Sequence, residues 1–142
     1  MKIAIASDHG GWALKQKVQL FLEDNGAQVH DFGCYSEESC DYPDFAHLLG
    51  YAVARGEYEY GVVICSTGNG ITITANKHTG VRAALCWKPQ IAELARKHNN
   101  ANVLGMPGKF LTVPTALQIV DKFFSTDFEG GRHERRVSKI EL

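Results

Sequence analysis

The chain has 142 residues, 44% hydrophobic and 22% charged, which suits one domain that buries roughly two-thirds of the surface its unfolded chain exposes. Its 15 basic and 16 acidic residues nearly cancel, so no overall field attracts nucleic acid or an anionic membrane. The four cysteines form no C-x-x-C pair, and only a short apolar run follows Lys2. We therefore expect a protein of the reducing cytoplasm with neither a signal peptide nor a membrane span.

Short apolar runs alternate with longer segments of helical period along the whole chain. The predicted strands are Lys2–Ala6, Gln28–Phe32, Gly61–Cys65, Val81–Cys86 and Asn102–Leu104. Helical segments are expected to begin near Trp12, Tyr42, Gly70 and Pro89, and a last helix near Thr112. The run Ile71–Thr74 alternates apolar and β-branched residues, so a strand is an alternative there.

This alternation predicts one α/β domain over residues 1–142, with a basic tail over about 128–142. The expected architecture is a doubly wound, Rossmann-like three-layer sandwich with a mainly parallel five-stranded sheet in the order 2-1-3-4-5. Ligands of such sheets bind where the strands end, near the point at which the strand order reverses. Asp8 and His9 follow the first strand and Cys65 ends the third. We therefore expect a site between these two strands, although neither a dinucleotide fingerprint nor a P-loop is present.

The run Cys65–Gly70 places a thiol and a hydroxyl beside a glycine-rich turn between a predicted strand and helix. Glycines let the backbone approach a ligand, and free N–H groups at a helix start favour a phosphate, an enediolate oxygen or a thiolate. An inert cysteine beside an ordinary turn is the alternative. Arg132–Arg136 likewise contains three arginines, which fit either a solvated surface or an anion site.

Six segments stand in a distinctive order along the chain: Asp8–Gly11, Asp41–Pro43, Cys65–Gly70, Ala75–Lys77, Arg96–Asn102 and Glu129–Arg136. With these segments the chain resembles the type B ribose-5-phosphate isomerase family over nearly its whole length. The resemblance implies interconversion of ribose 5-phosphate and ribulose 5-phosphate in the pentose phosphate pathway through a cis-enediolate, with no metal or organic cofactor. The family also includes subunits of galactose-6-phosphate isomerase and enzymes active on allose 6-phosphate. A six-carbon substrate or a non-catalytic sugar-phosphate-binding subunit therefore stays open.

The resemblance also implies catalytic roles. Cys65 would be the base, because Ile71 stands where other members carry a glutamate. Thr67 would move protons between two substrate oxygens while the nearby amides stabilise the enediolate, and His98 would open the sugar ring with help from Asp8. The alternatives are helix caps for Thr67 and Asp8 and a surface histidine at a helix end for His98.

The substrate-binding residues implied by the resemblance hold the sugar or its phosphate. They are His9, Tyr42, Ser66, Gly68, Asn69, Gly70, Asn99, Lys109, Arg132 and Arg136. Lys109 stands where the family would have an arginine, and a lysine keeps the charge but loses the bidentate fork. Tyr42 has hydrophobic packing beside Pro43 as its alternative role. Three cysteines and three histidines receive no chemical role: Cys34, Cys40, Cys86, His30, His47 and His78.

The topology leads to an expected assembly. His98 precedes a strand and Cys65 ends one, so they belong to opposite edges of the sheet, roughly 13–20 Å apart for strands of this length. If both serve one site, His98 must come from a second subunit. We expect a homodimer with composite sites, or a tetramer built from it, with a small sugar phosphate as ligand and neither nucleic acid nor membrane as partner.

Overall fold

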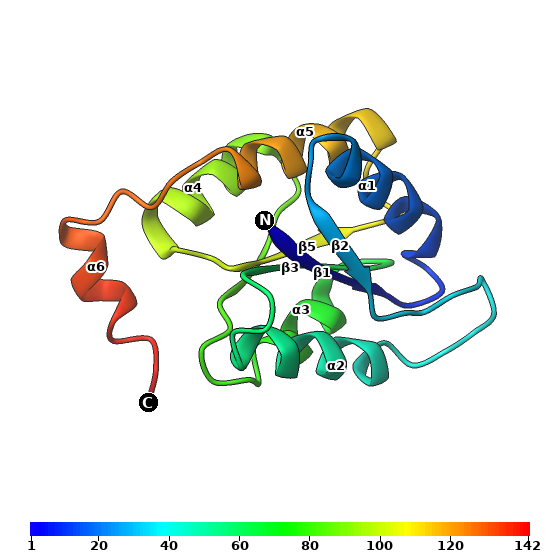
Figure 1. Ribbon diagram of the computed structural model, residues 1–142, viewed down its shortest axis with the longest axis horizontal. Helices are drawn as coiled ribbons and strands as arrows, with labels where there is room; N and C mark the ends of the chain where they lie inside the picture. The colour runs from blue at the N-terminus through cyan, green and yellow to red at the C-terminus, as the bar shows by residue number, and fades with distance from the viewer.

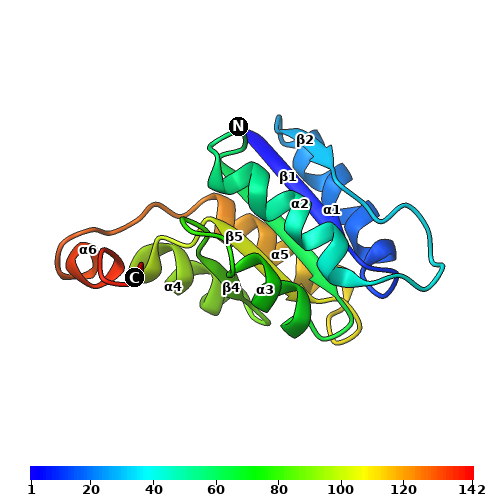
Figure 2. The same ribbon diagram turned by 90° about the horizontal axis from the view of Figure 1, so that it is seen from below.

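The computed structural model describes all residues, Met1–Leu142, as a five-stranded parallel sheet between two layers of helices (Figure 1). The strands are β1 (Lys2–Ser7), β2 (Gln28–Asp31), β3 (Tyr60–Cys65), β4 (Ala83–Leu85) and β5 (Val103–Pro107). The helices are α1 (Trp12–Asp24), α2 (Tyr42–Ala54), α3 (Asn69–Ala75), α4 (Pro89–Asn99), α5 (Val113–Phe124) and α6 (Arg132–Val137). Helices α1, α4 and α5 cover one face and α2 and α3 the other, as Figures 1 and 2 show. The predicted three-layer α/β class is confirmed.

The order of the strands is β2-β1-β3-β5-β4, so the predicted order of the last two is wrong. Strand β5 lies between β3 and β4, with Gly61 opposite Val103 and Cys65 opposite Pro107. Every residue of β5 is buried, whereas all three residues of β4 are only partly buried. A strand that is apolar on both faces needs cover from both helical layers, so β5 takes the interior and the shorter β4 the edge.

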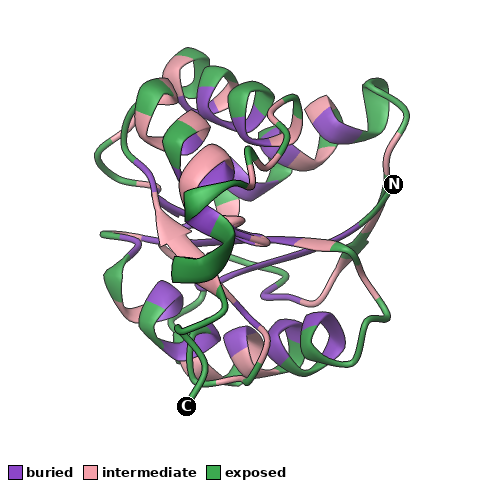
Figure 3. Cartoon of the chain, turned by 90° about the vertical axis from the view of Figure 1, so that its left-hand side faces the viewer, coloured by how far each residue is buried: buried purple, intermediate pink, exposed green.

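Two hydrophobic clusters lie on the two faces of the sheet (Figure 3). The larger holds 17 buried residues and packs β1, β3 and β5 against α1, α4 and α5. In α1, Leu14, Val18 and Leu22 recur four residues apart and enter this cluster, which is the spacing that predicts the helix. The smaller cluster packs the other face against α2 and α3.

The run Ile71–Thr74 is helical and lies within α3. Ile71, Thr74 and Ala75 are buried while Ile73 is exposed, which is the burial pattern of a helix rather than of a strand. The Thr74 hydroxyl donates to the Gly70 carbonyl over 2.8 Å. This bond within one turn satisfies the hydroxyl of the buried threonine inside the helix.

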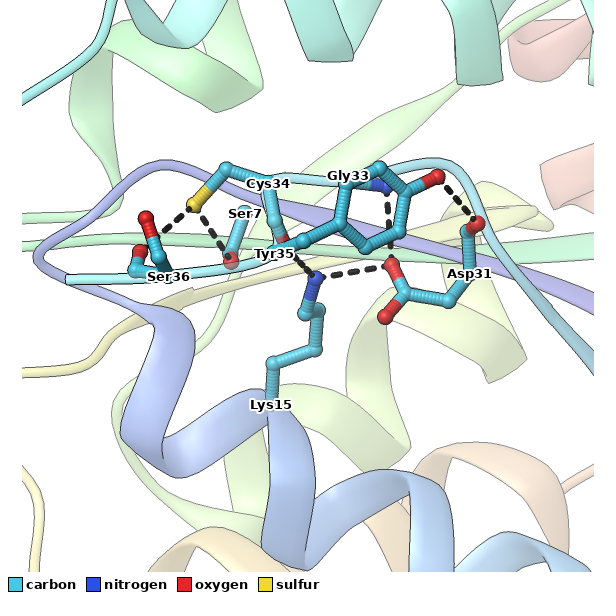
Figure 4. A network of polar contacts seen from close by, with 7 residues as sticks. All are labelled: Ser7, Lys15, Asp31, Gly33, Cys34, Tyr35 and Ser36. Carbon is cyan, nitrogen blue, oxygen red and sulfur yellow. Dashed lines mark hydrogen bonds and ion pairs between the residues drawn. The ribbon is translucent and has the colours of Figure 1, made fainter. Parts of the chain in front are cut away.

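Lys15, on α1, is completely buried and joins α1 to β2 and the loop after it (Figure 4). Its ammonium lies 2.7 Å from an Asp31 carboxylate oxygen and donates to the Cys34 carbonyl. The same Asp31 oxygen accepts the Gly33 N–H at 2.8 Å. Because a buried charge is tolerated only when it is paired, this network fixes the path of the chain leaving β2.

The segment after α5 leaves the body of the protein and ends in α6, which lies beyond the C-terminal end of α4 in both views (Figures 1 and 2). The Glu129 N–H donates to the Lys97 carbonyl over 3.1 Å and attaches this segment to α4. The sequence predicts a basic tail here but not the helix at Arg132–Val137. None of the helices combines the length and hydrophobicity needed to cross a bilayer.

Candidate active site

The turn after β1 is built around Asp8, which is 6% exposed. One Asp8 carboxylate oxygen accepts the N–H groups of Gly10 and Gly11 at 2.9 and 3.2 Å, and the Asp8 N–H donates to the Ile64 carbonyl. The N-cap of α1 is Gly11, without a side-chain cap. Asp8 therefore holds the turn in shape and does not cap the helix.

The turn after β1 packs directly on the loop after β3. A Cβ atom on Gly10 would lie 2.1 Å from the Ser66 hydroxyl, and one on Gly11 would lie 2.3 Å from the Ile64 carbonyl oxygen. The backbone contact of Gly11 allows only glycine there, while a side chain at position 10 would displace the Ser66 hydroxyl. The structure thus brings the Asp8 and Cys65 loops together between β1 and β3, as the sequence predicts.

The loop from Cys65 to Gly70 turns from β3 into α3. Cys65 is 5% exposed at the end of its strand, and Gly68 has a φ of +75° with no room for a side chain against the Met106 carbonyl. The exposed Thr67 accepts the Asn69 N–H at its hydroxyl over 3.2 Å. The first N–H groups of a helix have no partner within it, so α3 directs donors toward this loop.

Two further segments border the Cys65 loop. The Tyr42 ring, at the start of α2, packs so close to Gly70 that a Cβ there would lie 2.5 Å from Tyr42 Cζ; the ring is still 38% exposed. After β5, the Lys109 N–H donates to the Ser66 carbonyl over 3.0 Å. Because β5 neighbours β3, the exposed Lys109 lies beside the thiol loop.

His9 follows β1 at the same end of the strands as Cys65 and is partly exposed. Its Nδ1 accepts the backbone N–H of Cys40 over 3.2 Å. An Nδ1 that accepts a hydrogen bond places the proton of the neutral ring on Nε2. His9 can therefore donate from Nε2 to an anion at this end of the strands.

A second group of polar residues lies at the end of α4. His98 stacks on His133 of α6, with ring centroids 4.2 Å apart and an interplanar angle of 11°. A hollow of about 330 Å³ lies beside them. It is lined by His98, Asn99, His133, Arg136, Val137 and Ile140.

His133 was not predicted as a site residue. It is buried, and its Nε2 has no hydrogen-bond partner. Burial lowers the pKa of His133, and the neighbouring His98 and Arg132 lower it further. Only its place in the Glu129–Arg136 run could have marked it, because its contact with His98 spans 35 positions of the chain.

The same cluster does not suit a metal ion. Glu129 is near enough for ligand atoms of His98, Glu129 and His133 to lie within 4.8 Å of one another, but nearly parallel imidazoles cannot both direct their in-plane lone pairs at one ion.

The two groups lie at opposite ends of the parallel strands. Arg96, one turn before Asn100, donates to the Tyr60 hydroxyl over 3.3 Å, which places the end of α4 beside the start of β3. Cys65 lies at the other end of β3, roughly 16 Å away at the usual rise per residue. A single chain therefore forms two separate groups of predicted site residues. The first group holds Cys65, Thr67, Asp8, His9, Ser66, Gly68, Asn69, Gly70, Tyr42 and Lys109. The second holds His98, Asn99 and Arg136, with Arg132 on the same helix as Arg136.

Comparison with known proteins identifies the family of this chain. The family model described as Ribose/Galactose Isomerase matches residues 3–140. The chain belongs to this family. Ribose-5-phosphate isomerase B of Escherichia coli is 43% identical over 139 residues, covering 98% of this chain and 93% of that protein.

Solved structures from the family agree with the fold. The chain is 51% identical to a ribose 5-phosphate isomerase from Thermotoga maritima, with a TM-score of 0.96 and coverage of 99% and 97% of the two chains. Ribose-5-phosphate isomerase B from Mycoplasma genitalium, solved with bound ribulose-5-phosphate, is 44% identical at a TM-score of 0.94 and coverage of 98% and 93%.

Proposed function

We propose that this protein interconverts ribose 5-phosphate and ribulose 5-phosphate through a cis-enediolate. One observation carries the proposal: the Cys65 thiol ends β3 where the amide-lined Cys65–Gly70 loop packs on the Asp8 turn. A proton acceptor and anion-stabilising donors then stand together, which is what removal of a carbon-bound proton needs. A family member from Mycoplasma genitalium with bound ribulose-5-phosphate supports the choice of substrate.

In this mechanism Cys65 takes the proton from the carbon beside the carbonyl and returns it to the neighbouring carbon. The Gly68–Gly70 amides stabilise the enediolate oxygen, and the exposed Thr67 hydroxyl moves a proton between the two substrate oxygens. Ser66, Asn69 and Tyr42 border the sugar.

Ring opening and phosphate binding use groups from both ends of the parallel strands. His98, with Asp8, transfers the proton that opens the ring, and Asn99 binds a sugar oxygen. His9, Arg132 and Arg136 bind the phosphate, because guanidinium groups form paired hydrogen bonds with it. Lys109 adds a single positive charge beside the same loop.

The functional protein is a homodimer in this proposal. Each site takes Cys65 from one subunit and His98 with the α6 arginines from the other. Within a single chain, Cys65 and His98 lie at opposite ends of the parallel strands. A two-fold axis repeats the pairing and yields two equivalent sites.

Substitution of Cys65 by Ala tests the reaction. Turnover of ribose 5-phosphate should be lost while binding of the sugar phosphate persists, because the phosphate contacts remain. Cys86→Ala is the matched control, since Cys86 is buried in the larger hydrophobic cluster, on the opposite face of the sheet from Cys65. Near-native turnover of Cys65→Ala would remove this residue from the mechanism.

The substrate is tested by assaying the parent protein on ribose 5-phosphate, allose 6-phosphate and galactose 6-phosphate. Highest turnover on ribose 5-phosphate is expected. A preference for a six-carbon sugar phosphate would replace the substrate, and binding of all three without turnover would favour a non-catalytic subunit.

A further inference from the structure

Two cysteines outside the proposed mechanism flank the turn that carries His9. Cys34 follows β2 and is buried, with its sulfur 4.0 Å from the Ser7 hydroxyl. Cys40 is partly exposed, with its sulfur 3.9 Å from His9 Nδ1. Since Ser7 and His9 are two residues apart, both thiols lie along one short stretch of chain.

The Cys34 thiol donates to the Ser36 carbonyl over 3.4 Å, within the loop that joins the two cysteines. Burial raises the pKa of Cys40, and the nearby Cys34 raises it further, against the opposing effect of the His9 contact. The residues between them, Tyr35–Ser39, are all exposed and belong to no helix or strand. Because no ladder of backbone hydrogen bonds restrains this loop, the sulfurs can approach without breaking a helix or the sheet.

One end of this loop is fixed more firmly than the other. The Cys34 N–H donates to the Ser7 carbonyl over 2.8 Å, and the Cys34 carbonyl accepts from the buried Lys15 (Figure 4). The Cys40 backbone donates only to His9 Nδ1. When the sulfurs join, Cys40 is therefore the end that moves, and its bond to His9 is the contact that moves with it.

We propose that Cys34 and Cys40 form a reversible intrachain disulfide that withdraws the Cys40 support from His9 and weakens the binding of phosphate. The effect on phosphate rests on the proposed role of His9, whereas formation of the bond does not. Disulfides of this kind in reducing compartments are transient and redox-sensing.

The oxidant is a low-molecular-weight disulfide such as oxidised glutathione. The Cys40 thiolate attacks one of its sulfurs, and one small thiol leaves. The Cys34 thiolate then displaces the second small thiol. The protein loses two electrons and two protons, and the oxidant becomes two thiols.

The bond is tested by equilibrating the full-length protein in buffers of oxidised and reduced glutathione. Equilibration is used because Cys40 is mostly protonated at neutral pH and exchanges slowly. Cleavage after Glu37 and Glu38 separates the two cysteines, so a disulfide appears as one linked peptide pair that separates on reduction. We expect this pair in the parent and in Cys86→Ser, and none in Cys40→Ser. Glutathione adducts alone, or no change in any buffer, would overturn the proposal.

The effect on His9 is tested by the affinity of oxidised and reduced protein for inorganic phosphate, which needs no turnover. We expect about tenfold weaker binding after oxidation, the loss of roughly one hydrogen bond to a charged group, with recovery on reduction. The Cys34→Ser/Cys40→Ser variant should show no such change. Equal weakening in that variant would assign the effect to Cys65, and unchanged affinity in a protein with the linked pair would overturn the coupling to His9. If Cys34→Ser destabilises the core, Cys40→Ser serves alone, because Cys40 is not fully buried.

Discussion

Arg132 and Arg136 stand one helical turn apart on α6, with exposed side chains. Substitution of either by Ala should weaken binding of substrate and inorganic phosphate about tenfold to a hundredfold, the effect of losing hydrogen bonds to a charged group. Lys109→Ala should weaken it less, because an ammonium forms no bidentate contact. Competition by inorganic phosphate measures each effect.

Arg135 supplies the matched control on the same helix. It is exposed and has no proposed contact with phosphate, so Arg135→Ala should bind phosphate like the parent. If phosphate competes equally against the parent and all of these variants, the basic run on α6 is only a solvated surface.

The sequence predicted the positions of residues best where they directly follow strands. Asp8 and Cys65 end neighbouring strands, and parallel strands bring such residues together whatever the details of packing. His133 and Cys40 were not predicted as functional. Their neighbours, His98 and His9, lie 35 and 31 positions away along the chain, and no periodicity encodes contacts over such separations.

At the scale of elements, the Lys15–Asp31 pair joins α1 to β2. Asp31→Asn should reduce the free energy of unfolding by about 3–5 kcal/mol, because it leaves a buried ammonium without its counter-charge. Lys15→Met should cost clearly less, since the Asp31 carboxylate retains 19% side-chain exposure and the Gly33 N–H. Urea unfolding measures both.

The exposed Arg55–Glu57 pair is the control for this comparison. Glu57→Gln should change stability by less than about 1 kcal/mol. A loss in Lys15→Met as large as that in Asp31→Asn would show that packing of the lysine chain, and not its charge, determines the stability of this joint.

A histidine pair joins α2 to the segment after α3. His47 Nδ1 lies 2.8 Å from His78 Nε2, and burial followed by the charge of His47 lowers the pKa of His78 below 6.5. The unfolded chain therefore binds a proton more readily, and stability should fall as pH drops below about 6.5. In His78→Phe this decline should be shallower, while His133 preserves part of it.

Urea unfolding between about pH 7.5 and 5.5 spans the window in which an ordinary histidine titrates. His30→Phe is the control, because it removes an exposed histidine of the edge strand and leaves the His47–His78 contact in place. A slope in His78→Phe as steep as in the parent would exclude His78 as a source of the acid sensitivity.

The helices and strands were predicted more accurately than the order in which the strands pair. The helix starts at Trp12, Tyr42 and Pro89 follow from apolar spacing and start signals, and the structure confirms them. Strand order was predicted from a common arrangement of such sheets and was wrong for β4 and β5, because an apolar run shows that a strand is buried but not which strand pairs with it. The run Val103–Met106 is apolar throughout, which is the one signal that favoured the interior.

At the scale of the whole molecule, the proposed composite site predicts complementation between two inactive variants. Cys65→Ala and His98→Ala, unfolded together and refolded, should form mixed dimers with one doubly damaged and one intact site. Half of all dimers are mixed after random pairing, so about a quarter of parental activity should return. The assay uses the ring-closed sugar phosphate, because an open-chain substrate would bypass His98.

Each variant refolded alone is the control and should stay inactive. Subunit exchange is verified by mass spectrometry of the mixed species. If exchange is complete and no activity returns, both residues act within one chain, and the proposed dimer would have to be abandoned.

The insertion of β5 between β3 and β4 has a consequence for biosynthesis. Strand β4 pairs only with β5, so a nascent chain that has released Ala83–Leu85 from the ribosome does not yet contain the native partner strand of this segment. The first three strands can already form their sheet at that stage, with Asp8 and Cys65 side by side. The edge strand and α4 with His98 must wait until Val103–Pro107 emerges. The Asp8 and Cys65 part of the proposed site can therefore form earlier in translation than the part that contains His98 and α6.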